Sequence, residues 1–500
     1  MMRAFMHFTL PNRRIIWQLA LASLISMLVY LVASALYNGI GFPLDDSWIH
    51  LTYARNLALH YEWAFQPGRP SAGSTAPLWT TLLSIGFFLK LAPYIWTYLL
   101  GTLLLWGMGL VGEMVLRQVS PTYQSRFPWV GLFLILEWHM AWSAASGMET
   151  LLHALLITTV LGMLMSGSRR FMTLGLLAGL SVWVRPDGIT LLGPVIVYAL
   201  AGKGPVQSVD EAPGKKRWRD LSLFLIGFAT LFVPYLLFNL ILAGTPMPNT
   251  FYAKQAEYAA WQARPFFERF GELSLQFLLG PSLALLPGAI VWFIISLRKR
   301  DWGTLVGMVW FGGYLFLYIE RLPVYQHGRY IMPAMPIFFL WGLAAVLKFA
   351  QSKFFGRYHW LASTGWNFFA GLLCVAFWLV GANTYAQDVT LIETEMVASA
   401  KWVAENIPQE ELIAAHDIGA LGYFDTHELI DLAGLISPEV IPFIRDEERL
   451  AEFLDESGAA YLVAFPDFYP LLSRMAQPVY ETKGIGPELG GDNMVVYHWR

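Results

Sequence analysis

The sequence predicts a polytopic α-helical membrane protein of about 11 to 13 spans, followed by a small C-terminal α/β domain outside the membrane. Of its 500 residues, 56% are apolar or aromatic and 14% are charged, whereas a soluble chain carries about 25% charged residues. The mean hydropathy is +0.48. Long apolar runs recur up to about residue 386, and acidic runs with short apolar strands follow.

The apolar runs locate the candidate spans. A spanning helix needs about 20 apolar residues, and fewer where it is broken. The first long run follows Arg13 and Arg14 and stays uncharged until Asp45, so it is too long for a signal-peptide core and we interpret it as a retained span. A shorter run, 77–89, is expected to be a juxtamembrane or re-entrant helix. The candidate spans are 15–37, 94–116, 127–144, 151–165, 171–184, 189–200, 221–242, 275–297, 302–319, 332–347 and 364–385.

The distribution of Lys and Arg predicts the orientation. The connections that would face the cytoplasm carry 18 of these residues, and the opposite connections carry 8. Cytoplasmic loops are enriched in Lys and Arg, so we expect a cytoplasmic N-terminus in the plasma (inner) membrane. The number of candidate spans is odd, so the C-terminal segment emerges outside. We therefore divide the chain into a transmembrane module, 1–386, with a first outer loop at 41–76, and a soluble extracytoplasmic α/β domain, 387–500.

Composition also excludes several classes of site. The net charge of −3 gives no footprint for nucleic acid. Cys374 is the only cysteine, which excludes an intrachain disulfide and a cysteine-based metal site. No strong metal-binding motif is present, although a divalent cation held by Asp46 and Glu149 stays an open alternative.

An adjacent pair of carboxylates opens the first outer loop. Asp45 and Asp46 directly follow a span, where charge is costly unless it is hydrated or paired. Neighbouring carboxylates raise each other's pKa, which suits a general base. The alternative interpretation is a helix N-cap with an acidic first turn at the membrane edge.

Other polar clusters fall on the same predicted face. Taken singly, each has a structural explanation, such as a tight turn with a local ion pair, a helix break or a snorkelling side chain. Taken together they favour one shared polar cavity with carboxylates for proton transfer and cations for phosphate. The clusters are Glu149; Arg185 and Asp187; Asn249, Tyr252 and Lys254; and His327, Arg329 and Tyr330.

Several short segments, in this order and spacing, resemble the GT-C superfamily of polyprenyl-phosphate-sugar-dependent glycosyltransferases. The likeness is greatest to the bacterial branch that includes mannosyl- and arabinofuranosyltransferases. The segments are DDSWI (45–49), YARNLA (53–58), STAPLW (74–79), SGMET (146–150), RPDG (185–188), PNTFYAK (248–254), GRY (328–330), DIGALGY (417–423) and DLAGL (431–435).

The resemblance implies roles for the clustered residues. The acidic pair would hold the catalytic base, with Asp45 as first choice and Asp46 as second, and Glu149 would orient the acceptor or an ion. Asp-Asp replaces the commoner Asp-Glu of the superfamily, which leaves the choice of base open. The lipid phosphate would be bound by Arg185, Lys254, Arg329 and His327. Contacts to substrate are expected from Arg55, Asp187, Asn249, Tyr252 and Tyr330.

The implied function is transfer of a hexosyl or pentosyl group from a polyprenyl-phosphate donor to an acceptor hydroxyl on the extracytoplasmic face, with inversion. The acceptor would be a glycan, a lipid or a protein, and the donor would have its tail among the membrane lipids. Two alternatives belong to other classes. One is a polytopic transporter or lipid flippase, and the other is a non-catalytic glycan-binding scaffold.

Overall fold

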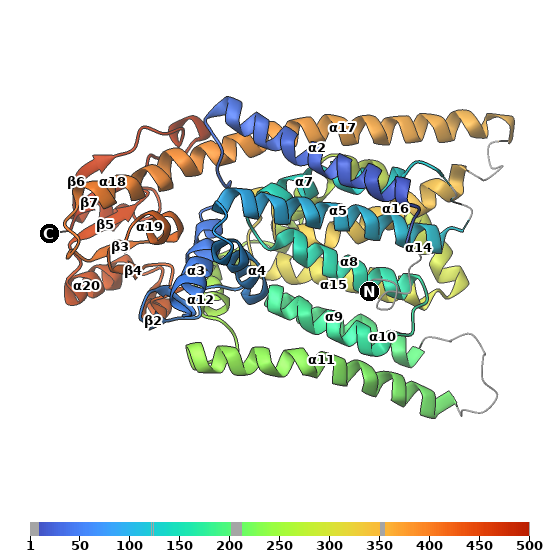
Figure 1. Ribbon diagram of the computed structural model, residues 1–500, viewed down its shortest axis with the longest axis horizontal. Coiled ribbons are helices and arrows are strands. Elements are labelled where there is room, and N and C mark those ends of the chain that lie inside the picture. Colours follow the sequence, from blue (N-terminus) through green and yellow to red (C-terminus); the bar gives the residue numbers. More distant parts are fainter. Residues whose placement is uncertain (1–9, 122, 124, 202–212, 351–355, 500) are drawn as a thin grey trace.

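A computed structural model describes residues 10–121, 123, 125–201, 213–350 and 356–499. Long helices run side by side as a bundle, and a small domain containing a β-sheet lies at one end (Figure 1). The bundle and its connections comprise α2 (Arg13–Tyr37), α3 (Asp46–His60), β1 (Ala64–Gln66), β2 (Arg69–Pro70), α4 (Pro77–Phe88), α5 (Pro93–Val119), α6 (Trp129–Leu136), α7 (Trp138–Ala145), α8 (Thr150–Met165), α9 (Phe171–Val184), η1 (Pro186–Leu191), α10 (Leu192–Ala201), α11 (Pro213–Ala243), α12 (Asn249–Glu257), η2 (Ala259–Ala263), α13 (Phe266–Leu278), α14 (Pro281–Lys299), α15 (Trp302–Arg321), η3 (Gln326–Gly328), η4 (Met332–Ala334), α16 (Met335–Ala350), η5 (Gly356–Tyr358) and α17 (His359–Ile392).

The bundle has the helices of a multi-pass membrane protein. In the described part of the chain, 7 helices are long and apolar enough to cross a membrane, and shorter apolar helices accompany them at 77–88, 150–165, 171–184 and 186–201. Their outer faces expose large apolar side chains such as Leu36, Ile241 and Phe368, as expected of surfaces that face lipid. The predicted class of polytopic α-helical membrane protein is thereby confirmed, and the number of spans stays a prediction.

The expected single span at 127–144 is two short helices in the structure. Glu137 separates α6 from α7, and its side chain accepts hydrogen bonds from the backbone N–H groups of His139 and Met140. Its other oxygen lies 2.7 Å from His139 Nδ1. A buried carboxylate needs such partners, and the N-terminus of a new helix supplies them.

The small domain follows α17 without a break in the helical path, because a π-helical turn η6 (Glu393–Val397) joins α17 to α18 (Ala398–Asn406). The expected boundary at residue 386 therefore lies within α17. The remaining elements are β3 (Ile413–Ala415), α19 (Gly419–Phe424), β4 (Leu429–Asp431), η7 (Pro438–Phe443), α20 (Glu447–Ser457), β5 (Tyr461–Ala464), α21 (Pro470–Met475), β6 (Gln477–Glu481), η8 (Pro487–Leu489) and β7 (Val495–His498).

The sheet of the small domain has the strand order β4-β3-β5-β7-β6. Strand β3 is parallel to β4 and β5, whereas β7 is antiparallel to β5 and β6. Every residue of β3 is buried, as its uninterrupted apolar sequence predicts for a central strand. Helix α20 begins at an Asp446 N-cap and ends at Gly458, which has φ +72°, a left-handed conformation that glycine adopts without strain.

The small domain is joined to the first loop through α3 and α19. Helices α3, α4 and α12 lie between the bundle and the sheet (Figure 1). Trp48 of α3 packs on Tyr423 and Phe424 of α19, with each pair of ring centroids 4.7 Å apart. Most of helix α3 is thus buried between the two parts of the chain, and its polar side chains are divided between them.

Candidate functional site

A pocket of about 620 Å³ lies where the first loop, the bundle and the small domain meet. It brings together seven of the residues singled out in the sequence, which come from five different segments. Asp46 belongs to α3, Lys254 to α12 and Asp187 to η1, while Leu435 reaches the pocket from the small domain. The seven are Asp46, Glu149, Arg185, Asp187, Lys254, Arg329 and Tyr330.

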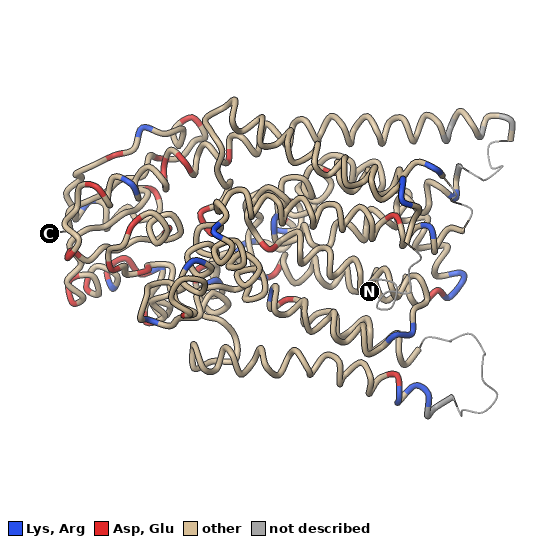
Figure 2. The backbone as a smooth tube through the Cα atoms, in the orientation of Figure 1, with Lys and Arg blue, Asp and Glu red and all other residues tan. Residues whose placement is uncertain are grey.

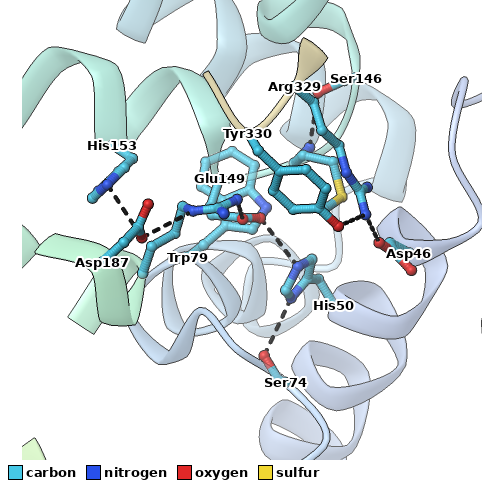
Figure 3. Close-up of polar contacts among 12 residues, drawn as sticks. Asp46, His50, Ser74, Trp79, Ser146, Glu149, His153, Asp187, Arg329 and Tyr330 are labelled. Atoms are coloured by element: carbon cyan, nitrogen blue, oxygen red, sulfur yellow. Dashed lines mark hydrogen bonds and ion pairs between the residues drawn. The ribbon is translucent and has the colours of Figure 1, made fainter. Parts of the chain in front are cut away.

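One side of the pocket is a cluster of charges around the ring of Tyr330. Arg329 Nη2 donates to Asp46 Oδ2 at 2.6 Å and to the Tyr330 hydroxyl at 3.0 Å (Figure 3). Lys254 Nζ donates to the same hydroxyl at 3.0 Å. The guanidinium carbons of Arg185 and Arg329 and the amine of Lys254 lie 5.0 to 5.3 Å from the centroid of the Tyr330 ring. Tyr330 therefore holds three cations close together.

A second cluster in the pocket is centred on Glu149. Arg185 Nη1 donates to Glu149 Oε1 at 3.0 Å. His50 Nε2 lies 3.3 Å from Glu149 Oε2 (Figure 3). His50 Nδ1 in turn lies 3.2 Å from the hydroxyl of Ser74. Both oxygens of the buried Glu149 thus have cationic or potentially cationic partners, so its carboxylate is held in place.

Asp187 is the most fully bonded acid of the pocket. Arg185 Nε donates to Asp187 Oδ1 at 3.2 Å, and the Tyr314 and Tyr318 hydroxyls donate to Oδ2. His153 Nε2 lies 3.5 Å from Oδ1. The carboxylate of Asp187 thus orients Arg185. The Arg-Pro-Asp-Gly turn therefore forms the local ion pair that was one of the two explanations of this cluster.

The electrostatic environment keeps two pocket acids ionised. Burial acts to raise the pKa of Asp46, but Arg329 and Lys254 outweigh it and hold that pKa well below its usual range. Burial acts in the same direction on Glu149, but the bond to His50 and the charge of Arg185 lower its pKa to about 2. Of these two, only Asp46 is substantially open, with 35% of its side chain exposed against 2% for Glu149.

Asp45 and Arg55 lie outside the lining of the pocket and bind α19 instead. Asp45 Oδ2 and Oδ1 accept hydrogen bonds from the backbone N–H groups of Gly419 and Ala420 at 2.6 and 2.8 Å. Arg55 donates to the carbonyls of Tyr423 and Gly422 at 2.7 and 2.9 Å. The first N–H groups and the last carbonyl groups of a helix have no partner within the helix. Asp45 and Arg55 bond to these groups at the two ends of α19, so they connect the first loop to the small domain.

Three further sequence candidates also lie outside the pocket lining. His327 Nε2 lies 2.8 Å from Asp388 Oδ2, which also accepts from Trp142 Nε1 at 2.9 Å. Asn249 donates to the carbonyl of Leu435 at 3.1 Å, and Tyr252 packs edge-on against the neighbouring Phe251. His327 therefore anchors the segment that carries Arg329, and Asn249 anchors α12 to the small domain.

Sequence reasoning missed several pocket contacts. His50 lies four residues after Asp46, a spacing that places both on one face of a helix, so it could have been grouped with the acid pair. Tyr314 and Tyr318 have the same spacing, but they lie inside an apolar span and look like packing residues. His153 likewise lies inside an apolar helix.

The described residues contain no group of three or more His, Cys, Asp or Glu arranged to hold a metal ion. Asp46 and Glu149, the pair considered for a divalent cation, both line the pocket. Asp46 is paired with Arg329, and Glu149 is paired with Arg185 and His50.

The architecture defines a polytopic membrane protein with a polar pocket between its bundle and a terminal domain, and known structures share it. The crystal structure of ArnT from Cupriavidus metallidurans bound to undecaprenyl phosphate matches with a TM-score of 0.58 at 16% identity, over 95% of this chain and 97% of that chain. The apo state of the same protein gives a TM-score of 0.60 at the same identity and coverage. The apo Archaeoglobus fulgidus oligosaccharyltransferase gives 0.56 at 12% identity, over 89% of this chain and 69% of that chain.

These likenesses confirm that the chain has the GT-C fold. A family model described as a domain of unknown function (DUF8728) matches residues 382–497, which include the small domain. A comparison with curated proteins gave no match.

Proposed function

We propose that this chain is a membrane glycosyltransferase that moves a sugar from a polyprenyl-phosphate donor to an acceptor hydroxyl. The observation that carries the proposal is the Asp46–Arg329 pair, in which an accessible carboxylate and a buried guanidinium share one pocket. The fold supports it, because a solved protein of the same fold binds undecaprenyl phosphate. The sugar would be a hexose or a pentose.

Arg329 is the group best placed to bind the phosphate of the donor. Its Nε and Nη1 are buried and have no hydrogen-bond partner among the described residues. Guanidinium donors pair strongly with phosphate oxygens, and an unpaired buried donor is costly. Lys254 and Arg185 flank the same Tyr330 ring and would add positive charge where the leaving phosphate gains negative charge.

Asp46 is the group best placed to act as the base. Pairing with Arg329 keeps its carboxylate ionised, and its exposure leaves it open to a substrate. In the proposed step the acceptor oxygen attacks the anomeric carbon on the face opposite the phosphate. The new C–O bond forms as the bond to the phosphate oxygen breaks, the acceptor proton passes to Asp46, and polyprenyl phosphate leaves with its electron pair. One such displacement inverts the anomeric carbon.

The remaining pocket acids would position groups for this reaction. Glu149 and Asp187 hold Arg185 between them, which fixes its guanidinium beside the Tyr330 ring. If a divalent cation takes part, Asp46 and Glu149 are the carboxylates that would bind it. Chelation in the assay below addresses that point directly.

The charge distribution supports an extracytoplasmic pocket in the plasma (inner) membrane. Figure 2 shows Lys and Arg gathering at the end of the bundle away from the small domain, and cytoplasmic loops are the ones enriched in these residues. On this orientation the pocket and the small domain face outward. Because nucleotide sugars are cytoplasmic, a lipid-linked donor is the one able to reach the pocket.

The test is transfer by the purified full chain in lipid nanodiscs. Undecaprenyl-phosphate-linked mannose and arabinose serve as donors, with oligosaccharide, glycolipid and peptide acceptors, each with and without EDTA. We expect transfer with inverted anomeric configuration. If no donor is consumed while liposomes containing the protein show solute or lipid movement across the bilayer, the transporter alternative is correct.

A further inference from the structure

A second hollow, of about 330 Å³, lies at the seam between the bundle and the small domain. We call it the seam hollow. Its walls come from the end of α12, from η2, from α13, from residues 323–325 and, across the seam, from the small domain. The residues that matter here are Glu257, Tyr258, Trp261, Arg264, Glu272, Tyr325 and Arg445.

The seam hollow adjoins the main pocket through two shared segments. Tyr258 N–H donates to the carbonyl of Lys254 at 3.2 Å, one turn back along α12. The carbonyl of Tyr325 accepts from the backbone N–H of Arg329 at 3.4 Å. The segments that carry Lys254 and Arg329 in the main pocket therefore also carry Tyr258 and Tyr325 in the seam hollow.

The aromatic side chains of the seam hollow suit a sugar ring. The rings of Tyr258 and Tyr325 have centroids 5.6 Å apart and are tilted by 55°, and Tyr325 is 47% exposed. Aromatic side chains offer an apolar face together with a polar hydroxyl. The C–H face of a pyranose or furanose packs on such a ring while the sugar hydroxyls bond to polar groups around it.

The charged side chains of the seam hollow balance one another. Arg264 Nη2 lies 2.6 Å from Glu272 Oε1, and Arg445 Nη2 lies 3.8 Å from Glu257 Oε1. This balance contrasts with the cluster of three cations around Tyr330 in the main pocket, so an anionic ligand gains little here. Carboxylates and guanidinium groups still accept from and donate to hydroxyls, which favours a neutral polyol.

The two hollows also differ in the surface that a ligand would cross. Ile189, Leu317 and Leu322 add apolar lining to the main pocket, which suits the first units of a prenyl chain. The seam hollow is open to water, since the side chains of Arg264, Glu272 and Arg445 in its walls are 42%, 43% and 59% exposed. A donor would thus be held by its lipid in the main pocket, while an acceptor would enter the seam hollow from water.

We propose that the seam hollow binds the acceptor, and that the acceptor is a neutral carbohydrate with a sugar ring against Tyr325 and Tyr258. This inference rests on the proposed transferase function. It assigns the acceptor to the glycan class, with the reactive hydroxyl directed past Tyr258 toward the main pocket.

The experiment compares Tyr325→Ala with Tyr37→Ala in the full chain in nanodiscs. Tyr37 is the last residue of α2, is similarly exposed at 52% and lines neither hollow. Acceptors are short oligosaccharides from mannan and arabinan. For Tyr325→Ala we expect the acceptor KM to rise at least tenfold, while kcat at saturating acceptor and the Kd for undecaprenyl phosphate stay unchanged. Tyr37→Ala should match the wild type in all three.

Failure of this inference is distinguishable from failure of the proposed function. If Tyr325→Ala transfers sugar with an unchanged acceptor KM, the seam hollow is not the acceptor site, but the proposed transferase function still holds. If the wild type transfers nothing, the proposed function fails, and saturation-transfer NMR with the same oligosaccharides then decides. Signal that disappears in Tyr325→Ala but persists in Tyr37→Ala supports a carbohydrate site. Equal signal in both variants, or none in the wild type, overturns it.

Discussion

Replacing Asp46 with Asn should abolish turnover and at the same time tighten the binding of undecaprenyl phosphate. The carboxylate would be the proton acceptor, and a positioned base contributes about 10²- to 10⁴-fold to rate. It is also an anion bonded at 2.6 Å to the guanidinium that would bind the phosphate. At a separation of roughly 5–8 Å and an effective dielectric constant of about 20, two unit charges repel by about 2–3 kcal/mol.

Solvent screening reduces that repulsion, because 35% of the Asp46 side chain is exposed. We therefore expect undecaprenyl phosphate to bind Asp46→Asn roughly 3- to 10-fold more tightly. The amide oxygen can still accept from Arg329, so unfolding temperature should change little. Binding is measured by calorimetry in nanodiscs and turnover by release of undecaprenyl phosphate from its mannose conjugate.

Asp45→Asn is the matched comparison, since it makes the same chemical change one residue away. The two carboxylate oxygens of Asp45 accept from two N–H groups of α19, whereas Asn has only one side-chain oxygen. The unfolding temperature of Asp45→Asn should therefore fall, while its affinity for undecaprenyl phosphate stays the same. Full turnover in Asp46→Asn, together with lost turnover and unchanged stability in Asp45→Asn, would refute the reasoning and make Asp45 the base.

The remaining predictions concern cations, anchors and pH. Arg329→Gln should weaken undecaprenyl phosphate binding at least tenfold by calorimetry, because a neutral amide has fewer donors and no charge. His327→Ala should weaken the same binding by a smaller factor, because only the anchor to Asp388 is lost. Arg55→Ala should speed hydrogen exchange in residues 413–431 and lower the unfolding temperature by several degrees, because it removes two charge-assisted bonds worth about 1.5–3 kcal/mol each. Burial and the nearby charge of Asp46 raise the pKa of Asp417 to about 7. Between about pH 4 and pH 7 the folded state therefore binds more protons than the unfolded state. The stability of the folded state consequently falls as the pH rises through that window. Asp417→Asn should flatten this fall in a thermal scan from pH 5 to pH 8.

The convergence of charged clusters could be predicted from the sequence, because it depends only on which face each loop reaches. The order of the apolar runs decides on which membrane face each connecting loop lies. It places Asp46, Glu149 and Arg329 on the same face, so a common pocket at that face is expected. Counting apolar residues likewise predicts the bundle. It does not predict the break at Glu137, because that depends on a buried carboxylate finding helical N–H donors.

The proposed division between Asp46 as base and Asp45 as anchor could not be predicted from the sequence. Asp45 and Asp46 have the same chemistry, and nothing local to them distinguishes a base from an anchor. The distinction comes from α19, whose N–H groups lie 374 and 375 residues further along the chain. The partner of His327 is hidden for a related reason, since Asp388 lies 61 residues further along the chain, in α17.

The small domain is therefore part of the pocket rather than an appendage to it. Asp45 is bonded to α19, and the very next residue, Asp46, is bonded to Arg329 of the bundle. Leu435 lines the pocket and also accepts the hydrogen bond of Asn249 in α12. A shift of the domain would move Asp46 relative to Arg329 through a single peptide bond, and a base misplaced by even 1 Å loses much of its effect. The contacts of α19 and Leu435 thus place the small domain under the same geometric constraint as the pocket residues themselves.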